Sequence, residues 1–122
     1  MMRVLIVDDE PLVKRVLTHC LEREGYAVDC ACNGEAALER IRAQSPDLLI
    51  TDVNMPGMSG EDLCRAIHAE FPQRRFPILV MTSSSGRECR AWAEGIPDTD
   101  FVEKPVSPRI LIARLGRLAA HA

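Results

Sequence analysis

Short apolar runs alternate with longer amphipathic stretches along this chain of 122 residues. Residues 4–7, 48–50, 78–81 and 101–102 form apolar runs typical of buried strands, and a weaker run covers 26–31. The stretches between them repeat apolar residues every three or four positions, which is the period of a helix with one buried face. Strands that are apolar throughout and alternate with helices indicate a parallel sheet covered on both faces. With right-handed crossovers, the sequence predicts one α/β domain, a doubly wound five-stranded parallel sheet with five helices.

Residues that favour helix ends fall at the expected boundaries. Pro11 suits the first turn of the first helix, and Gly25 suits its end. Asn33 and Ser59 each precede a helical stretch and are candidate N-caps. The fourth helix, within 83–95, is the weakest prediction because it begins Ser-Ser-Ser-Gly and has few aliphatic residues.

Composition and charge narrow the possible functions. Hydrophobic residues make up 47% of the chain and charged residues 27%, as in ordinary globular proteins. A net charge of −3 gives no basic surface for nucleic acid. No apolar run reaches the roughly 18 residues of a membrane span, and acids directly follow the short apolar N-terminal stretch. We therefore expect a cytoplasmic protein that binds neither nucleic acid nor a membrane.

The five cysteines form no clear metal or disulfide pattern. There is no CxxC pair, and only Cys30 and Cys32 are closely spaced. Their side chains would share one face of a strand, which leaves a metal or disulfide role open. Free cysteines that act as small buried hydrophobic residues are the favoured interpretation.

Polar and charged residues follow the ends of four predicted strands. Asp8 and Asp9 follow the first, Asp52 the third, Thr82 the fourth and Lys104 the fifth. In a doubly wound sheet the carboxyl ends of the strands form the ligand-binding edge, so we expect these side chains to meet. Crowded carboxylates repel one another, and Mg²⁺ relieves that repulsion. An ammonium and a hydroxyl beside the metal could hold a phosphate, and one carboxylate could be the nucleophile.

These residues give the chain a resemblance to the CheY-like receiver domains of two-component response regulators over essentially its whole length. Two longer segments add to the match, Asp52-Val53-Asn54-Met55-Pro56-Gly57 and Phe101-Val102-Glu103-Lys104-Pro105. The resemblance implies a flavodoxin-like fold and a single receiver domain over 1–122, without an output module. It implies a phosphoacceptor that receives a phosphoryl group on Asp52 from a sensor histidine kinase or a histidine phosphotransfer protein, in a Mg²⁺-dependent reaction.

The resemblance also implies roles for the other site residues. Asp9 would bind Mg²⁺ directly and Asp8 through water, while Asp52 and the backbone carbonyl of Asn54 would complete the ligands. Lys104 would bind the phosphoryl group and would be joined to Pro105 by a cis peptide bond.

A switch follows from the same resemblance. Thr82 would move toward the phosphoryl oxygens, and Phe101 would turn inward behind it. The surface of the fourth helix, fifth strand and fifth helix would then change for a downstream protein that the sequence cannot identify. Such a protein is a signalling phosphoacceptor, which assists only its own phosphorylation and dephosphorylation, and not an enzyme. Ser83 departs from the family, which often has Ala or Gly after the switch hydroxyl.

Simpler interpretations exist for single residues. Asp8 and Asp9 could be an N-cap pair before Pro11, and Glu10 is expected to be a solvated acid of the first helical turn. Trp92 could either pack inward or mark a partner surface.

Two other functions compete with the phosphoacceptor. A small Mg²⁺-dependent phosphatase of the haloacid dehalogenase type would also form an aspartyl phosphate. Such enzymes use an Asp-x-Asp motif, however, and Asn54 stands in place of the second acid. A degenerate receiver acting only as a protein-binding module is the other alternative, and the intact acids with Lys104 argue against it.

Overall fold

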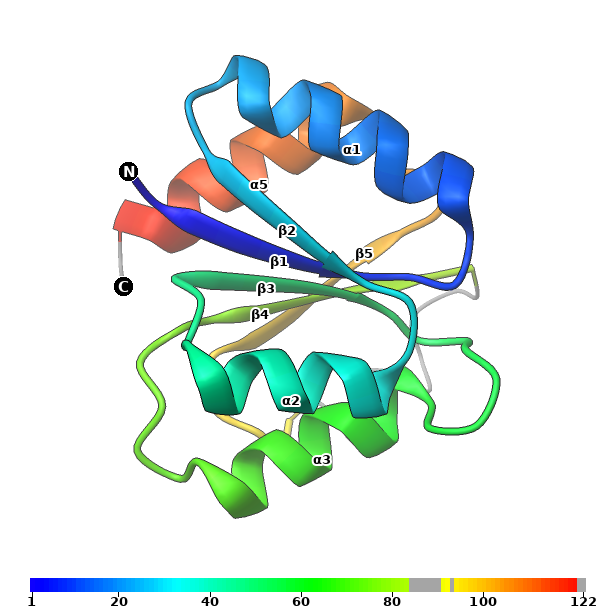
Figure 1. The fold of residues 1–122 in the computed structure, drawn as a ribbon, viewed down its shortest axis with the longest axis vertical. Coiled ribbons are helices and arrows are strands. Elements are labelled where there is room, and N and C mark those ends of the chain that lie inside the picture. The colour runs from blue at the N-terminus through cyan, green and yellow to red at the C-terminus, as the bar shows by residue number, and fades with distance from the viewer. Residues whose placement is uncertain (84–90, 93, 121–122) are drawn as a thin grey trace.

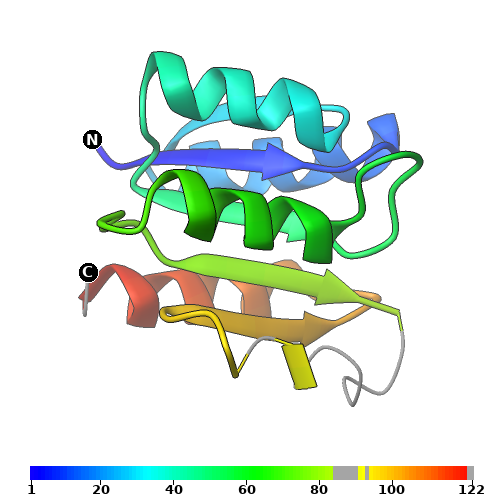
Figure 2. The same cartoon turned by 90° about the horizontal axis from the view of Figure 1, so that it is seen from below.

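A computed structural model describes residues 1–83, 91–92 and 94–120 of the chain. Five parallel strands form one sheet in the order β2-β1-β3-β4-β5 (Figure 1). Seen from below, the strands in view run in the same direction (Figure 2). The strands are β1 (Arg3–Val7), β2 (Ala27–Ala31), β3 (Leu48–Asp52), β4 (Ile78–Thr82) and β5 (Thr99–Glu103).

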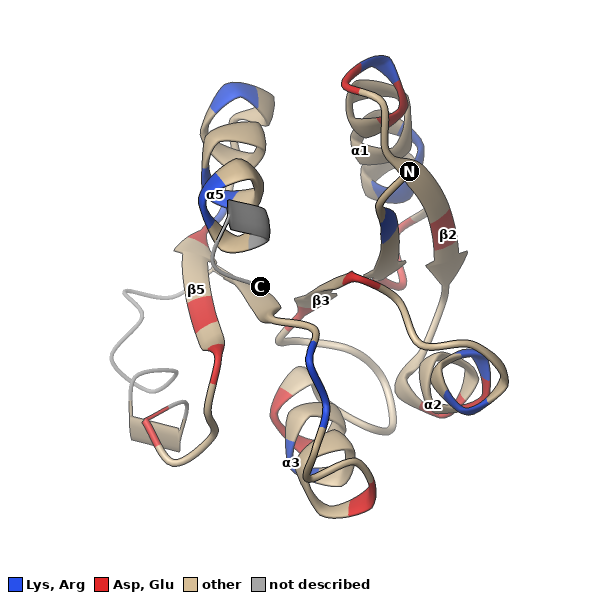
Figure 3. Cartoon of the chain, turned by 90° about the vertical axis from the view of Figure 1, so that its left-hand side faces the viewer, with Lys and Arg blue, Asp and Glu red and all other residues tan. Residues whose placement is uncertain are grey.

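Helices cover both faces of this sheet. The helices α1 and α5 lie on one face and α2 and α3 on the other, as the end-on view shows (Figure 3). Their bounds are α1 (Pro11–Arg23), α2 (Gly34–Ala43), α3 (Gly60–Glu70) and α5 (Pro108–Ala120). The predicted doubly wound α/β fold is therefore confirmed. The predicted fourth helix falls largely on residues 84–90 and 93, which lie outside the described residues.

Alternate residues of the central strands pack into two separate apolar layers. In β1, Leu5 and Val7 belong to the layer beneath α2 and α3, while Val4 and Ile6 belong to the layer beneath α1 and α5. All five residues of β3 and all five of β4 are buried. Burial on both faces explains why these strands read as continuous apolar runs and not as alternating ones.

Local signals in the sequence fix the helix starts. The Asn33 side chain accepts a hydrogen bond from the Ala36 N–H, which caps α2. Ser59 and Asp62 form a reciprocal capping box at the start of α3. Pro11 occupies the first turn of α1. These caps place the helix starts close to the strand ends that carry the polar residues.

The structure also settles the question left open for Trp92. This side chain is buried and packs in the layer beneath α2 and α3, so it lies inside the fold and not on a partner surface.

Among the described residues, Cys20, Cys30, Cys32 and Cys64 form no disulfide, and Cys64 is the buried one of the four. The Cys30 Sγ lies 3.4 Å from the Thr18 hydroxyl, and Cys32 is exposed one residue beyond the end of β2. Cys89 lies outside the described residues. Among the described helices, none is both long and apolar enough to cross a membrane.

Candidate functional site

The polar residues predicted at the strand ends lie together at the carboxyl edge of the sheet. Asp8 directly follows β1, Asp52 ends β3, Thr82 ends β4 and Lys104 directly follows β5. The parallel register aligns these strand ends, since Asp52 pairs with Met81 and Thr82 pairs with Glu103. Asp8, Asp52 and Thr82 are buried. Burial is unusual for acids such as the two aspartates.

Lys104 connects the acids of two separate strands. Its Nζ lies 3.1 Å from Asp52 Oδ2 and 3.6 Å from Asp8 Oδ2. The same Nζ lies 4.0 Å from Glu10 Oε1. The Lys104 side chain is only 20% exposed, so its ammonium faces these carboxylates more than it faces water.

Four acids form one cluster, and three of them lie within 4.0 Å of this ammonium. Asp8, Asp9, Glu10 and Asp52 each offer a carboxylate oxygen, and these four atoms lie within 4.8 Å of one another. Asp8 Oδ1 accepts a hydrogen bond from the Glu10 N–H, but Asp8 Oδ2 is buried without a hydrogen-bond partner. A buried carboxylate oxygen that lacks a donor is well suited to bind a hard cation such as Mg²⁺.

The pKa values of Asp8 and Lys104 are both raised above their ordinary values. Burial raises the pKa of the Asp8 carboxyl, and the hydrogen bond from Glu10 and the charge of Lys104 offset this only in part. Burial lowers the pKa of Lys104, but the hydrogen bond and charge of Asp52, with the charges of Asp8 and Glu10, raise it overall. Both shifts reflect a site that favours added positive charge.

The cap interpretation of the two adjacent aspartates is wrong. The N-cap of α1 is Glu10, and its side chain makes no capping hydrogen bond. Asp8 instead turns its second oxygen toward Lys104, and Asp9 belongs to the acid cluster.

The backbone that follows Asp52 is held by neighbouring elements. The Val53 N–H donates to the Met81 carbonyl at 3.0 Å, and the Gly60 N–H donates to the Val53 carbonyl at 2.9 Å. The Asn54 N–H lies 3.4 Å from Asp52 Oδ1. These bonds tie the start of α3 and the end of β4 to the residue after Asp52, so they fix where its carboxylate lies.

Gly60 comes closer to this backbone than any other residue type could. A Cβ added at Gly60 would lie 2.7 Å from Val53 Cα and would also collide with the Asp52 carbonyl oxygen. No local sequence pattern singles out Gly60, because this contact joins two segments that are adjacent only in the folded chain.

The structure also places the remaining residues of the predicted site. The Lys104 N–H donates to the Thr82 carbonyl at 2.6 Å, and the peptide bond between Lys104 and Pro105 is cis. Phe101 is partly buried against the layer beneath α2 and α3. The Asn54 side-chain amide lies 3.4 Å from the Ser83 hydroxyl, so the residue that departs from the family contacts the loop after Asp52.

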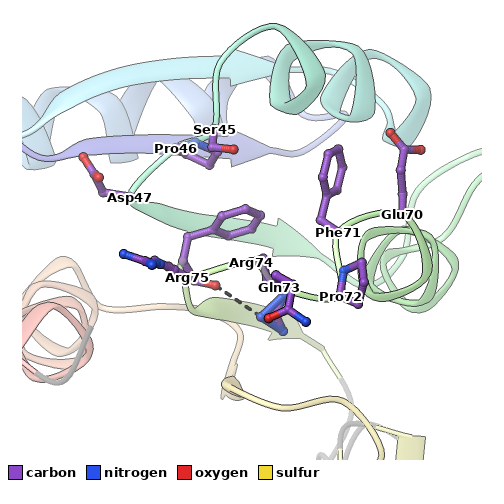
Figure 4. Close-up of a pocket in the computed structure, with 10 residues that line it drawn as sticks. Ser45, Pro46, Asp47, Glu70, Phe71, Pro72, Gln73, Arg74 and Arg75 are labelled. Atoms are coloured by element: carbon purple, nitrogen blue, oxygen red, sulfur yellow. Dashed lines mark hydrogen bonds between the residues drawn. The ribbon is translucent and has the colours of Figure 1, made fainter.

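A separate hollow lies at the opposite edge of the sheet. It has a volume of about 650 Å³ and is lined by residues 45–47 and 70–76, which precede β3 and β4 (Figure 4). There the Arg74 guanidinium donates to the Phe76 carbonyl at 3.3 Å and lies 5.7 Å from the centre of the Phe76 ring. The same guanidinium donates to the Pro97 carbonyl in the loop before β5, so Arg74 ties neighbouring loops together. The hollow is remote from the acid cluster.

Comparison with known proteins identifies the family. The family described as the response regulator receiver domain matches residues 4–116. The chain belongs to this family. It is thus a CheY-like receiver domain of the two-component response regulators.

Relatives of this receiver domain agree in sequence and in structure. The transcriptional regulatory protein ResD of Bacillus subtilis is 34% identical over 120 residues, which are 98% of this chain and 49% of ResD. The receiver domain therefore spans about half the length of that relative. The chemotaxis protein CheY4 of Vibrio cholerae is 31% identical with a TM-score of 0.89, covering 97% of this chain and 98% of CheY4. A response regulator from Chloroflexus aurantiacus is 33% identical with a TM-score of 0.88, covering 98% of both chains.

Proposed function

We propose that this receiver domain is a phosphoacceptor that takes a phosphoryl group on Asp52 in a Mg²⁺-dependent reaction. The observation that carries the proposal is the meeting of acids from two strands around one ammonium. Asp52 Oδ2 lies 3.1 Å from Lys104 Nζ, beside a buried Asp8 oxygen that has no hydrogen-bond partner. The donor is a sensor histidine kinase or a histidine phosphotransfer protein.

The chemistry is nucleophilic displacement at phosphorus. An Asp52 carboxylate oxygen attacks the phosphorus of the donor phosphohistidine, and a new O–P bond forms as the P–N bond breaks. The electron pair of the P–N bond returns to the imidazole nitrogen, which takes a proton. The Lys104 ammonium and the Thr82 hydroxyl hold the equatorial phosphoryl oxygens, which supports charge on them in the transition state.

The acid cluster fits Mg²⁺ as the cation. Asp8, Asp9, Asp52 and the backbone carbonyl of Asn54 would hold it. When bound, Mg²⁺ neutralises the clustered carboxylates and the charge on the phosphoryl oxygens. Asp8 Oδ2 would then gain the partner that it lacks among the described residues.

Phosphorylation is proposed to act as a switch. Thr82 and Phe101 respond to the phosphoryl group and alter a docking surface for a downstream protein, to which β5 and α5 contribute. The domain is thus a signalling component and not a turnover enzyme. Asn54 supports this, because a phosphatase of the dehalogenase type would carry a second acid there.

Phosphorylation of Asp52 can be tested by intact mass. With a small phosphodonor and Mg²⁺, the wild-type protein should gain the mass of one phosphoryl group. The Asp52→Asn variant should gain none, and a chelator should suppress the gain in the wild type. Asp100→Asn is a matched control, since Asp100 lies on β5 and pairs with Arg114 outside the cluster. An Asp52→Asn protein phosphorylated at the wild-type rate would refute the assignment.

A further inference from the structure

Glu10 lies at the mouth of the acid cluster, and its carboxylate is not used by the helix that it begins. It is the N-cap residue of α1, yet its side chain makes no capping hydrogen bond. Its Oε1 instead lies 4.0 Å from Lys104 Nζ, and the side chain is 60% exposed. Its backbone N–H donates to Asp8 Oδ1 at 2.9 Å, which fixes the start of the side chain beside the buried acid.

The cluster carries more negative charge than its ammonium can balance. Four carboxylate oxygens lie within 4.8 Å of one another, and the ion pairs of these acids within the described part of the chain all involve Lys104. The fully buried Asp8 Oδ2 has no hydrogen-bond partner. This buried oxygen points independently to a cation as its partner, because an unpartnered buried carboxylate is costly.

The spacing brings Glu10 within range of a cation held by the aspartates. Two oxygens on opposite sides of one Mg²⁺ are about 4.2 Å apart, twice its usual bond length. The limit of 4.8 Å for the cluster is only slightly larger, so a Glu10 oxygen lies close to the outer boundary of such a site.

We infer that Glu10 is a further acid of the divalent-cation site, which strengthens cation binding through its charge. This inference rests on the proposed function, because it assumes that the aspartates hold a divalent cation. Glu10 acts from the solvent-exposed rim, where its attraction for the ion is screened by salt. It differs in this respect from the buried Asp8, whose interaction salt screens much less.

The test is a titration of the full chain with Mg²⁺ alone, measured by isothermal titration calorimetry. Glu10→Gln removes the charge and keeps the size of the side chain, and it should raise the dissociation constant about threefold to tenfold at low salt. Glu10→Asp keeps the charge and should stay within about twofold of the wild type. At about 1 M salt the difference between Glu10→Gln and the wild type should largely vanish.

Two further variants separate the possible outcomes. Glu22→Gln removes an exposed acid from the last turn of α1, at the end of that helix remote from Glu10, and should bind Mg²⁺ as the wild type does. Asp9→Asn tests the proposed function itself and should weaken binding much more than Glu10→Gln. If Asp9→Asn weakens binding while Glu10→Gln does not, the role of Glu10 is refuted and the proposed function stands. If neither the wild type nor any variant binds Mg²⁺, both are refuted.

Discussion

Asp8 shows at the scale of a single residue how the site departs from an ordinary core. It is a fully buried acid with one oxygen that accepts an amide hydrogen bond and another that accepts none. A buried polar atom left without a partner costs roughly 1–3 kcal/mol. In the absence of a cation, Asp8 therefore lowers the stability of the fold, while its free oxygen favours binding of a cation.

We predict that Asp8→Asn stabilises the protein in the presence of a chelator. At neutral pH the free energy of unfolding should rise by roughly 1–3 kcal/mol, because a neutral amide replaces a buried charge. Urea unfolding followed by circular dichroism measures this. Glu39→Gln, on the exposed side of α2, is the control and should change stability by less than about 0.5 kcal/mol.

The gain from Asp8→Asn should depend on pH in a definite direction. Burial raises the pKa of Asp8 in the folded protein above its ordinary value of 3.8, so the folded protein holds a proton that the unfolded chain has lost. The wild type therefore loses stability as the pH rises through that interval, and the loss persists above it. The advantage of Asp8→Asn should shrink as the pH falls toward 3.8. An equal gain at every pH would contradict this account.

At the scale of elements, the start of α3 positions the strand that ends in Asp52. The capping box of Ser59 and Asp62 fixes where α3 begins, and Gly60 then packs directly on the backbone that follows β3. The hydrogen bond from the Gly60 N–H to the Val53 carbonyl holds the two elements together. The place of Asp52 in the site thus depends on a helix that contributes none of the acids.

We predict that Gly60→Ala destabilises the protein although alanine favours helices. The added Cβ would collide with the backbone at Asp52 and Val53, and relieving such overpacking costs typically 1–3 kcal/mol. Phosphorylation of Asp52 should slow as well, because its backbone must shift. Urea unfolding and intact mass measure the two effects.

Gly116→Ala provides the matched control. Gly116 lies within α5, and a Cβ there would meet no atom within 4 Å. This substitution should stabilise the protein by about 0.5–1 kcal/mol. If both glycine variants gave the same change in stability, the close contact at Gly60 would have no energetic consequence.

At the scale of the whole molecule, the parallel sheet concentrates negative charge at one edge. Three strand ends contribute Asp8, Asp52 and Lys104 there, and two apolar layers hold the strands in register behind them. A cation held by all of these acids interacts with the folded chain only, because Asp52 is far from Asp8 and Asp9 along the sequence. Cation binding and folding are therefore coupled.

We predict that Mg²⁺ raises the melting temperature of the wild type. At a concentration of about one hundred times the dissociation constant, binding adds roughly 2.7 kcal/mol of stability. For a domain of this size that corresponds to a rise of about 10 °C. Asp9→Asn should lose most of the rise in the same thermal scans. A rise no larger than that given by sodium chloride of equal ionic strength would argue against a specific site.

The sequence by itself determined the succession of strands and helices and the acids that follow them. Apolar runs, Pro11 and the caps at Asn33 and Ser59 act over a few residues, so their effects can be read locally. The parallel fold then placed Asp52 and Lys104 at one edge, because the carboxyl ends of parallel strands must lie together.

Only the tertiary structure decided how the side chains at that edge meet. Glu10 was expected to be solvated, yet its carboxylate joins the cluster while remaining exposed. The sequence likewise could not predict three other features, namely the unpaired oxygen of Asp8, the close approach of Gly60 and the inward packing of Trp92. Each depends on contacts between segments far apart in sequence. The free energy of such contacts is determined by distance and burial in the folded protein, and not by the local sequence pattern.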